Sequence, residues 1–354
     1  MLVKATSLAV VLFLVVGSIS CGSSGSTGSH LAYVTLTGIN QVAGLSVSDS
    51  GSLTAITGSP FNTGKSPTSV VVHPSKNFLY IANATENTVS LFTIGKGGAL
   101  TEVTPRTTVG VDPIVLAMDP AGSYLFVGNL TDNTISAFSI DSSSGALTQI
   151  GSAFPVSSPV AMTVSPSGKF LYVANANTAT VSAYTLSSGA LTNGASFAAG
   201  SNPSSIAVDP SEHFLYATNV VSTTFAGFTI DANSGALTAM QGSPFTAGKN
   251  PSAAAVDTTG KFLYVANLGA NNVSAYTIDS TTGVPTQITK SPFTAGTAPV
   301  FAAVDTSGKF LYVGNETPRN ISGFSIDPST GALTATNQST TGVASAPTSI
   351  FITK

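Results

Sequence analysis

Phe262-Leu-Tyr-Val-Ala-Asn267 is the clearest copy of a phrase that returns along this chain of 354 residues. Related phrases occupy residues 78–83, 124–129, 170–175, 214–219 and 310–315, and a shorter version, Leu-Ala-Tyr-Val-Thr, occupies residues 31–35. The third position of the phrase falls at residues 33, 80, 126, 172, 216, 264 and 312, so seven copies follow one another at intervals of 44 to 48 residues. A fixed period in this range is typical of solenoids, propellers and arrays.

Each repeat contains four short apolar runs separated by turn residues. In the copy that starts near residue 251, the runs cover 252–257, 262–266, 272–278 and a short segment that ends near Ile288. They have the length of strands and are rich in Val, Ile, Phe, Tyr and Thr. No segment beyond the N-terminus shows helical periodicity. Four antiparallel strands in each of seven repeats predict an all-β protein, a seven-bladed β-propeller.

The two ends of the chain complement each other. Residues 346–354 (APTSIFITK) match the first, innermost strand of a repeat, whereas the first copy, from Leu31, begins at the second strand. One blade is therefore predicted to combine a C-terminal inner strand with N-terminal outer strands. This pairing closes the ring and leaves no blade with an unpaired inner edge. We predict a single propeller over residues 31–354, although the length alone suggests about two domains.

Three motifs of the repeat resemble those of lactonase-type seven-bladed propellers, which include 6-phosphogluconolactonase-like proteins and YVTN-repeat surface proteins. They are the Tyr-Val-Ala-Asn phrase, the Pro-x-x-x-x-Val-Asp-Pro-Ser-Gly-Lys lead-in, and the Ser-Gly-Ala-Leu-Thr turn at residues 144–148 and 234–238. The resemblance covers residues 31–354 and implies the same fold. These motifs form the strands and turns of the blades, so they predict the fold and do not indicate a particular activity. The chain has no Trp, so the Trp-Asp dipeptide of another propeller type is absent.

The N-terminus has the pattern of an export signal. Lys4 precedes an apolar stretch at residues 8–16, and small residues precede Cys21, the only cysteine. The stretch is too short to span a bilayer. We predict a signal peptide at residues 1–20, and Cys21 resembles the lipidated cysteine of bacterial lipoproteins, followed by a flexible tether at residues 21–30. The alternative is an ordinary secretory signal with a chance cysteine, and hence a secreted or periplasmic protein. Either interpretation predicts an exported protein, and the first places it in the cell envelope.

Composition excludes several partners. Charged residues make up 8% of the chain, against about 25% in an average protein. Removing Lys4 with the signal leaves 11 basic and 15 acidic residues (12 − 1 and 15), a formal net charge of −4. No basic cluster is present, so nucleic acid is excluded. Membrane contact is expected only through the lipid, and we expect a monomer with no cofactor. A single cysteine also excludes an intrachain disulfide.

Signatures of common active sites are missing. The sequence contains no Gly-x-Ser-x-Gly elbow, no His-Glu-x-x-His, no complete Gly-x-x-x-x-Gly-Lys-Ser/Thr phosphate-binding loop and no calcium-loop pattern. Of the three histidines, His30 lies at the tether and His213 lies in a turn at the position of a lysine in other repeats. We interpret His213 as a solvated turn residue.

The third histidine belongs to a set of residues that end the inner strands. His73 aligns with the residues at this position in the other repeats: Asp119, Ser165, Asp209, Asp257, Asp305 and Thr353. By symmetry they form a ring near one mouth of the channel, where carboxylates could hold a hard cation such as calcium. The alternative is that each Asp caps the tight turn that follows it, as Asx residues do.

Charged residues that depart from the repeat fall in loops at the opposite face. We single out Glu86, Arg106, Glu316 and Arg319, because an arginine beside carboxylates could orient a lactone carboxyl while a glutamate acts as a base. The alternative is that they are exposed loop charges without a role. Phe301, also off the repeat pattern, is either an apolar wall of such a site or filler between blades.

Three functions are compatible with these features. The regular blades, the few titratable residues and the tether favour a surface binding or interaction module, with an unknown small molecule or surface partner on the loop face. The family resemblance implies a lactone hydrolase similar to 6-phosphogluconolactonase, acting on a sugar lactone. The catalytic His, Arg and Glu proposed for that family cannot be assigned residue by residue in this chain. The ring that includes His73 indicates a cation-binding propeller as the third alternative.

Overall fold

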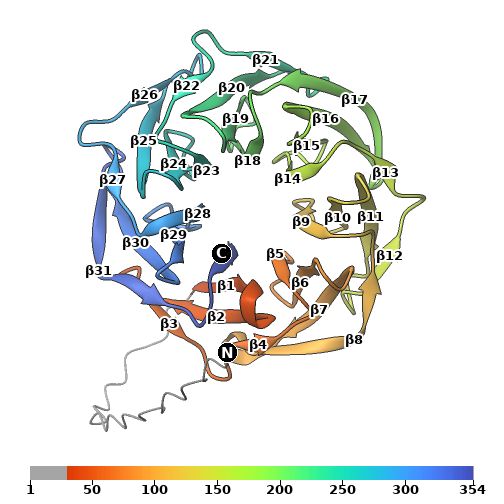
Figure 1. The fold of residues 1–354 in the computed structure, drawn as a ribbon. Coiled ribbons are helices and arrows are strands. Elements are labelled where there is room, and N and C mark those ends of the chain that lie inside the picture. Colours follow the sequence, from red (N-terminus) through yellow and green to blue (C-terminus); the bar gives the residue numbers. More distant parts are fainter. Residues whose placement is uncertain (1–29, 354) are drawn as a thin grey trace, which may run out of the picture.

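Seven blades surround a central channel in the computed structural model, which describes residues 30–353 (Figure 1). Each blade is an antiparallel sheet that runs from an inner strand at the channel to an outer strand at the rim. The prediction of an all-β, seven-bladed propeller is confirmed. The predicted signal peptide at residues 1–20 and Cys21 lie outside the described residues.

Both ends of the chain contribute to blade 1. Its inner strand is β32 (Pro347–Ile352), which pairs antiparallel with β1 (His30–Leu36), and Tyr33 lies opposite Phe351. The remaining elements of this blade are η1 (Thr37–Ile39), β2 (Gln41–Val47), β3 (Leu53–Ala55) and β4 (Phe61–Asn62). The predicted closure by N- and C-terminal strands is thus confirmed.

Three other blades end in one long outer strand. Blade 2 contains β5 (Pro67–Val72), β6 (Phe78–Asn83), β7 (Thr88–Ile94), η2 (Lys96–Gly98) and β8 (Leu100–Thr108). Blade 4 contains β14 (Pro159–Val164), β15 (Phe170–Asn175), β16 (Thr180–Ser187) and β17 (Ala190–Ala198). Blade 7 contains β28 (Thr297–Val304), β29 (Phe310–Thr317), β30 (Asn320–Ile326) and β31 (Leu333–Gly342).

The outer strand of the last three blades is split into two short segments, as in blade 1. Blade 3 contains β9 (Pro113–Met118), β10 (Tyr124–Asn129), β11 (Thr134–Ile140), β12 (Leu147–Gln149) and β13 (Phe154–Pro155). Blade 5 contains β18 (Pro203–Val208), β19 (Phe214–Asn219), β20 (Thr224–Ile230), β21 (Leu237–Ala239) and β22 (Phe245–Thr246). Blade 6 contains β23 (Pro251–Val256), β24 (Phe262–Asn267), β25 (Asn272–Ile278), β26 (Pro285–Gln287) and β27 (Phe293–Thr294).

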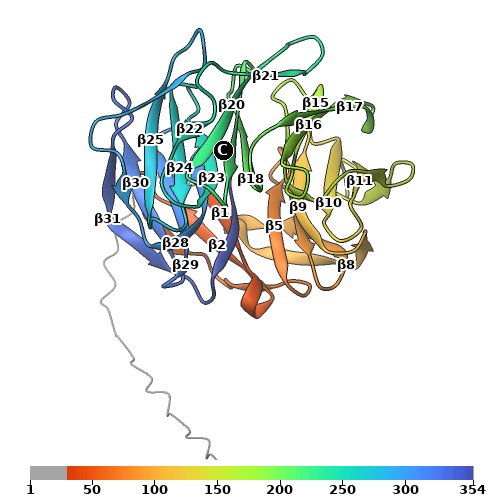
Figure 2. The same ribbon diagram turned by 45° about the horizontal axis from the view of Figure 1, so that its top comes forward.

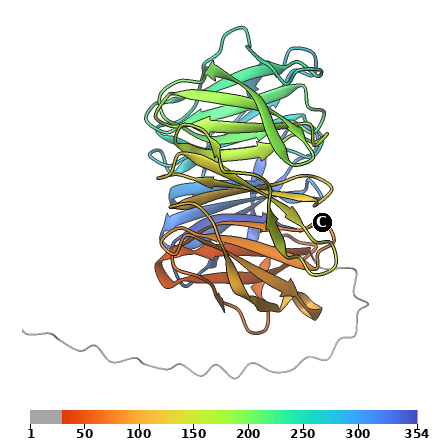
Figure 3. The same cartoon turned by 90° about the vertical axis from the view of Figure 1, so that its right-hand side faces the viewer.

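The connections lie on two opposite faces of the ring, which Figures 2 and 3 show tilted and edge-on. Because neighbouring strands are antiparallel, the turn after each inner strand and the turn after each third strand share one face, here called the turn face. The turns after the second strands and the connections between blades share the other face, here called the loop face. The inner strands contact their neighbours all the way round, including β28 with β32 and β32 with β5.

One hydrogen bond links successive blades at the turn face. In six of the seven blades, the buried tyrosine of the repeated phrase donates to the carbonyl oxygen of a glycine in the next blade. The pairs are Tyr33–Gly98 (2.8 Å), Tyr80–Gly145 (2.7 Å), Tyr172–Gly235 (3.2 Å), Tyr216–Gly283 (2.6 Å), Tyr264–Gly331 (3.0 Å) and Tyr312–Gly51 (2.9 Å). The last pair joins blade 7 to blade 1, and Phe126 replaces the tyrosine in blade 3.

The glycine in each pair is required by geometry. Gly331 has φ +71°, a left-handed conformation that favours glycine, and a Cβ on it would lie 2.4 Å from the ring of Phe262. The Phe and the Tyr of one phrase therefore contact the same glycine of the next blade. The recurring phrase and the recurring Ser-Gly turn are two halves of one interblade contact. Burial raises the pKa of Tyr264, so the phenol stays a hydrogen-bond donor at neutral pH.

The asparagine that ends the phrase is also buried. In blade 6, Asn267 Nδ2 donates to Asn272 Oδ1 (2.8 Å) and to Ser274 Oγ (2.9 Å). Blade 5 has Ala226 where blade 6 has Ser274. Both amide atoms of Asn219, which is 1% exposed, lack a hydrogen-bond partner among the described residues.

We expect Tyr264→Phe to lower the free energy of unfolding by about 1–2 kcal/mol, because it removes the bond and leaves the Gly331 carbonyl without a donor. Chemical denaturation of the purified protein measures this change. The matched control is Tyr124→Phe in blade 3, whose hydroxyl makes no hydrogen bond with the described residues. An equal loss in both variants would contradict a specific role for the interblade bond.

We expect Ala226→Ser to raise the free energy of unfolding by about 1 kcal/mol, because the new hydroxyl gives the buried Asn219 amide the partner that Ser274 gives Asn267. Thermal and urea unfolding test this effect. The reciprocal change Ser274→Ala should lower the stability by a similar amount. A destabilised Ala226→Ser protein would show that blade 5 has no room for the hydroxyl.

Candidate functional site

Arg106 and Glu86, two of the predicted loop-face residues, do come together. Arg106 Nη1 lies 2.8 Å from Glu86 Oε1, and its Nε lies 2.7 Å from Glu102 Oε1. The other oxygen of Glu86 accepts the backbone N–H of Lys65 at 2.9 Å. This bond first, and Arg106 second, lower the pKa of Glu86, while the hydrogen bond with Glu102 raises the pKa of Arg106. Two carboxylates therefore already neutralise the guanidinium, so the cluster resembles a structural ion pair more than a substrate anchor.

Glu316 and Arg319 lie in a different part of the loop face. Both are exposed and belong to the end of β29 and the turn before β30 in blade 7, whereas Arg106 lies in blade 2. Within residues 30–353 neither forms an ion pair. The structure does not bring the two arginines together. Phe301 is 7% exposed and packs so closely on Gly314 that a Cβ there would lie 2.0 Å from its ring, which favours the interpretation as filler.

The aspartates that end the inner strands are buried and serve their own turns. Asp257 Oδ1 accepts the N–H groups of Lys261 (2.7 Å) and Phe262 (2.8 Å), and its Oδ2 accepts that of Thr259 (2.9 Å). The same pattern recurs at Asp119, Asp209 and Asp305. In the part of the chain that the structure describes, no three His, Cys, Asp or Glu side chains are placed to hold a metal ion. The geometry matches the turn-capping alternative.

His73 is the exception in this set, because it links two blades. Its Nε2 lies 2.9 Å from the carbonyl oxygen of Gly122, and its Nδ1 lies 3.1 Å from Ser75 N and 2.8 Å from Ser75 Oγ. A carbonyl can only accept and a backbone N–H can only donate, so the proton is on Nε2 and Nδ1 is the acceptor. The exposed Ser75 hydroxyl therefore donates to the same Nδ1 lone pair that accepts the Ser75 N–H. His213 is exposed, as expected for a turn residue.

Lys76 also departs from the repeat. It has φ +61°, in the position that Gly122, Gly168, Gly260 and Gly308 occupy in other turns. Glu212 is the other non-glycine residue at this turn position. Its carboxylate accepts hydrogen bonds from the backbone N–H (2.9 Å) and the hydroxyl (2.8 Å) of Ser167 in the neighbouring blade. The Lys76 ammonium has no such partner among the described residues. A non-glycine residue in this conformation destabilises the fold by about 1–2 kcal/mol. No ion pair of Lys76 with the described residues offsets this destabilisation.

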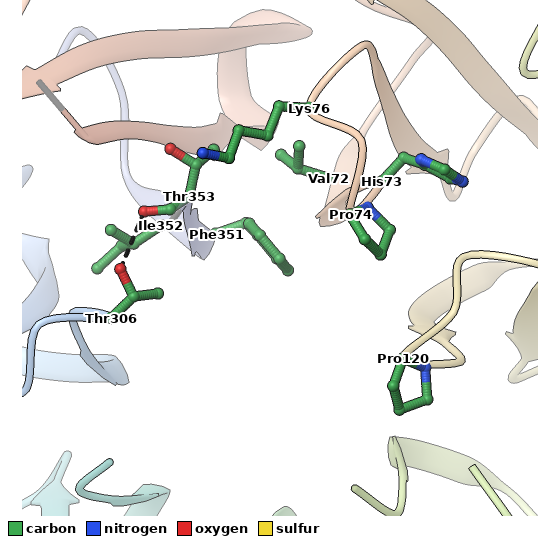
Figure 4. A pocket seen from close by; sticks show the side chains of 9 residues that line it. All are labelled: Val72, His73, Pro74, Lys76, Pro120, Thr306, Phe351, Ile352 and Thr353. Atoms are coloured by element: carbon green, nitrogen blue, oxygen red, sulfur yellow. Dashed lines mark hydrogen bonds between the residues drawn. The ribbon is translucent and has the colours of Figure 1, made fainter. Parts of the chain in front are cut away.

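A pocket of about 310 Å³ lies where these departures meet, at the mouth of the channel on the turn face; we call it the mouth pocket (Figure 4). It is lined by Val72, His73, Pro74, Lys76, Pro120, Thr306, Phe351, Ile352 and Thr353. Figure 4 shows the Lys76 side chain extending toward Thr353 and Phe351 reaching into the open space. Four blades thus contribute to one pocket with apolar walls and a single cation.

Phe351 and Lys76 were not predicted as site residues. Phe351 stands in an inner strand at the position that Val71, Ala117, Thr163, Ala207, Ala255 and Ala303 occupy in the other blades. Alignment of the inner strands marks it as the single aromatic residue of this set. An apolar residue in an apolar strand gives no other signal, and Lys76 resembles the lysines that follow one residue later in other turns.

The closed ring is a seven-bladed β-propeller with a pocket at one mouth of its channel. The family model described as "Lactonase, 7-bladed beta-propeller" matches residues 29–164, 161–246 and 238–350, and the chain belongs to this family. No curated protein matches the sequence. Among residues 30–353, no helix is long and apolar enough to cross a membrane.

Several solved structures share the fold at low sequence identity. A Bacteroides fragilis protein described as a candidate 6-phosphogluconolactonase is 20% identical with a TM-score of 0.82, over 94% of this chain and 100% of that chain. A Bacteroides uniformis protein of the same description is 16% identical with a TM-score of 0.81, over 92% and 99%. The periplasmic gluconolactonase of Pseudomonas aeruginosa is 17% identical with a TM-score of 0.78, over 92% and 99%.

We expect Lys76→Gly to leave the free energy of unfolding unchanged or to raise it by up to about 1 kcal/mol, because glycine adopts φ +61° without strain. Urea denaturation measures the change. Glu212→Gly, at the same position in blade 5, should instead lower stability by about 1 kcal/mol through loss of its bonds to Ser167. A clear loss in Lys76→Gly would reveal a structural role for the lysine.

Proposed function

We propose that this protein hydrolyses a lactone in the mouth pocket. The observation that carries the proposal is that three departures from the repeat, His73, Lys76 and Phe351, meet at one pocket in a member of the lactonase family. Residues that serve only the fold recur in register from blade to blade. Residues that differ from their equivalents in the other blades and meet at one site are expected where binding or chemistry takes place. A strained backbone conformation, as at Lys76, is a further sign of such a site.

Lactone hydrolysis needs a stabilised oxyanion and a proton acceptor for water. In the proposed reaction, water attacks the ring carbonyl while the Lys76 ammonium faces the developing oxyanion. The Ser75 hydroxyl, which stands between the lining residues Pro74 and Lys76 in the turn without lining the pocket itself, takes a proton from the water and passes its own to His73 Nδ1. When the ring C–O bond breaks, the departing alkoxide receives this proton from the imidazolium, which restores the starting state and leaves an open-chain hydroxy acid.

The charges of the pocket favour a substrate without a phosphate group. A phosphate dianion is usually held by several arginine or lysine side chains. Among the lining residues Lys76 is the only cation. Arg106 is neutralised by two glutamates, and Arg319 lies on the opposite face.

A second candidate is the non-catalytic binding module predicted from the sequence. It is favoured because both nitrogens of His73 are engaged, one by Gly122 of the next blade and one by Ser75 of its own turn. The buried aspartates are likewise engaged in hydrogen bonds of their own turns. In that case the mouth pocket, rather than the loop face, offers the binding site for a small molecule.

Export and a lipid anchor on Cys21 belong to the same proposal, with a secreted or periplasmic protein as the alternative. β1 begins at His30, whose Nδ1 lies 3.1 Å from the Thr353 carbonyl oxygen beside the pocket. A tether that continues from His30 therefore joins the propeller at the turn face. We propose a monomer, attached to the membrane only through the lipid.

We expect the purified protein to hydrolyse unphosphorylated lactones well above the spontaneous rate. His73→Ser places in blade 2 the residue that blade 4 has as Ser165, so the turn should persist while kcat/KM falls about 100-fold or more. Lys76→Gly should lower kcat/KM at least about tenfold. Arg319→Ala is the control and should be fully active. Titration of the acid that each lactone releases measures the rates.

Two results would contradict the proposal. Activity lost in Arg319→Ala but kept in Lys76→Gly would place the site on the loop face. The absence of hydrolysis on every lactone would leave the binding module as the function to pursue.

A further inference from the structure

We infer that the mouth pocket selects lactones with an apolar alkyl or aryl substituent, and that it binds the corresponding open-chain hydroxy acids with the carboxylate at Lys76 and the substituent against Phe351. This inference rests on the proposed function, because it names the substrate class of the same site. It differs from the polyhydroxylated sugar lactones that the structural neighbours' names suggest.

The walls of the pocket are the first support. Five lining residues are apolar, namely Val72, Pro74, Pro120, Phe351 and Ile352. A sugar ring needs a hydrogen-bond partner for each hydroxyl that it buries, since an unpaired polar group is costly. An alkyl chain needs none, and each methylene that it buries improves affinity about fourfold.

The polar groups of the pocket are largely committed to the protein. Thr306 Oγ1 donates to the Thr353 carbonyl oxygen at 3.2 Å, and Thr353 Oγ1 accepts the backbone N–H of Leu31 at 3.0 Å. His73 is held between Gly122 and Ser75. The Thr353 hydroxyl proton and the Lys76 ammonium remain as donors, which suits one carboxylate or one lactone carbonyl and not a ring of hydroxyls.

The origin of the pocket explains why its wall is apolar. In blades 2 to 7 the inner strand continues into a turn that leads directly to the second strand, as β5 leads to β6. In blade 1 the two strands come from opposite ends of the chain, so this connection is missing beside Phe351. A large aromatic side chain stands at this one place, where every other blade has a smaller residue. Its ring is only partly buried.

The size of the pocket limits the ligand. Its volume of about 310 Å³ lies at the lower end of the range of small-molecule sites, roughly 300–1,000 Å³. The cavity therefore suits a small lactone ring with a short substituent. A single ammonium matches the single charge of a hydroxy acid.

The experiment compares a series of γ-lactones with alkyl substituents of increasing length against glucono-δ-lactone, and measures binding of the open-chain 4-hydroxy acids and of gluconate by calorimetry. The full-length protein is tested beside Phe351→Ala, which introduces the residue that blades 3, 5, 6 and 7 have at this position. Lys76→Gly is tested beside its matched control Glu212→Gly.

We expect kcat/KM and the affinity for the hydroxy acids to rise about fourfold per added methylene until the pocket is filled. Phe351→Ala should flatten this dependence and weaken the longest ligand at least tenfold. Lys76→Gly should weaken every hydroxy acid about tenfold, and Glu212→Gly should leave binding unchanged.

The outcomes separate this inference from the proposed function. Faster hydrolysis of glucono-δ-lactone than of any alkyl lactone would overturn the inference and leave the hydrolase intact. Binding of alkyl hydroxy acids that depends on Phe351 and Lys76, without hydrolysis of any lactone, would support the ligand class and overturn the hydrolase. Failure to bind any hydroxy acid, together with no dependence of rate on chain length, would overturn the inference.

Discussion

The hydrogen bond from a buried tyrosine to a glycine carbonyl in the next blade is the contact on which this propeller depends. A single four-stranded sheet cannot bury both of its faces, so a blade is stable only between two neighbours. The Tyr-Gly bond fixes how closely and at what rotation two blades meet, because the carbonyl must lie within hydrogen-bonding distance of a phenol on a rigid strand. The phenylalanine two residues earlier packs on the same glycine, so any side chain there would force the blades apart. Six of the seven interfaces have this contact, including the one between Tyr312 and Gly51 that joins blade 7 to blade 1. The interface after blade 3, which has Phe126, lacks the hydrogen bond.

The repeat made most of the fold predictable. The period, the strand lengths and the complementary ends led to seven blades and to closure in blade 1, since these features depend on patterns that many residues share. What the sequence did not show was the direction in which individual polar groups point. Asp257 was a plausible ring ligand by position, yet the nearest donors to its carboxylate are the N–H groups of the following turn. Glu86 and Arg106, singled out separately as loop charges, form an ion pair. The second partner of Arg106 is Glu102, four residues earlier on the same strand, and no departure from the repeat marked it.

The candidate site illustrates the opposite situation, in which information lies in the exceptions to the repeat. Phe351 and Lys76 look ordinary one at a time, because an aromatic residue in a strand and a lysine in a turn are common. They become informative when the blades are superposed, since each replaces a smaller residue at one place in the ring. In a protein with sevenfold pseudosymmetry, every blade offers the same mouth-facing positions. An asymmetric ligand is recognised where one blade differs from the others. Blade 1 always differs, because it is assembled from the two ends of the chain and lacks the turn between its first two strands.

Closure through blade 1 also orders the events of folding. β1 and β32 pair across more than three hundred residues of chain, as Ala32 opposite Ile352 shows. Blades 2 to 7 are each continuous in sequence and rest on local contacts, which form early, whereas the most distant pairing in the chain is expected to form last. Until then the second strand of blade 1 presents an open edge that can pair with another chain. During synthesis, the protein therefore passes through an open arc of blades. Pairing of the C-terminal strand β32 with β1 closes this arc into a ring and covers the last exposed strand edge.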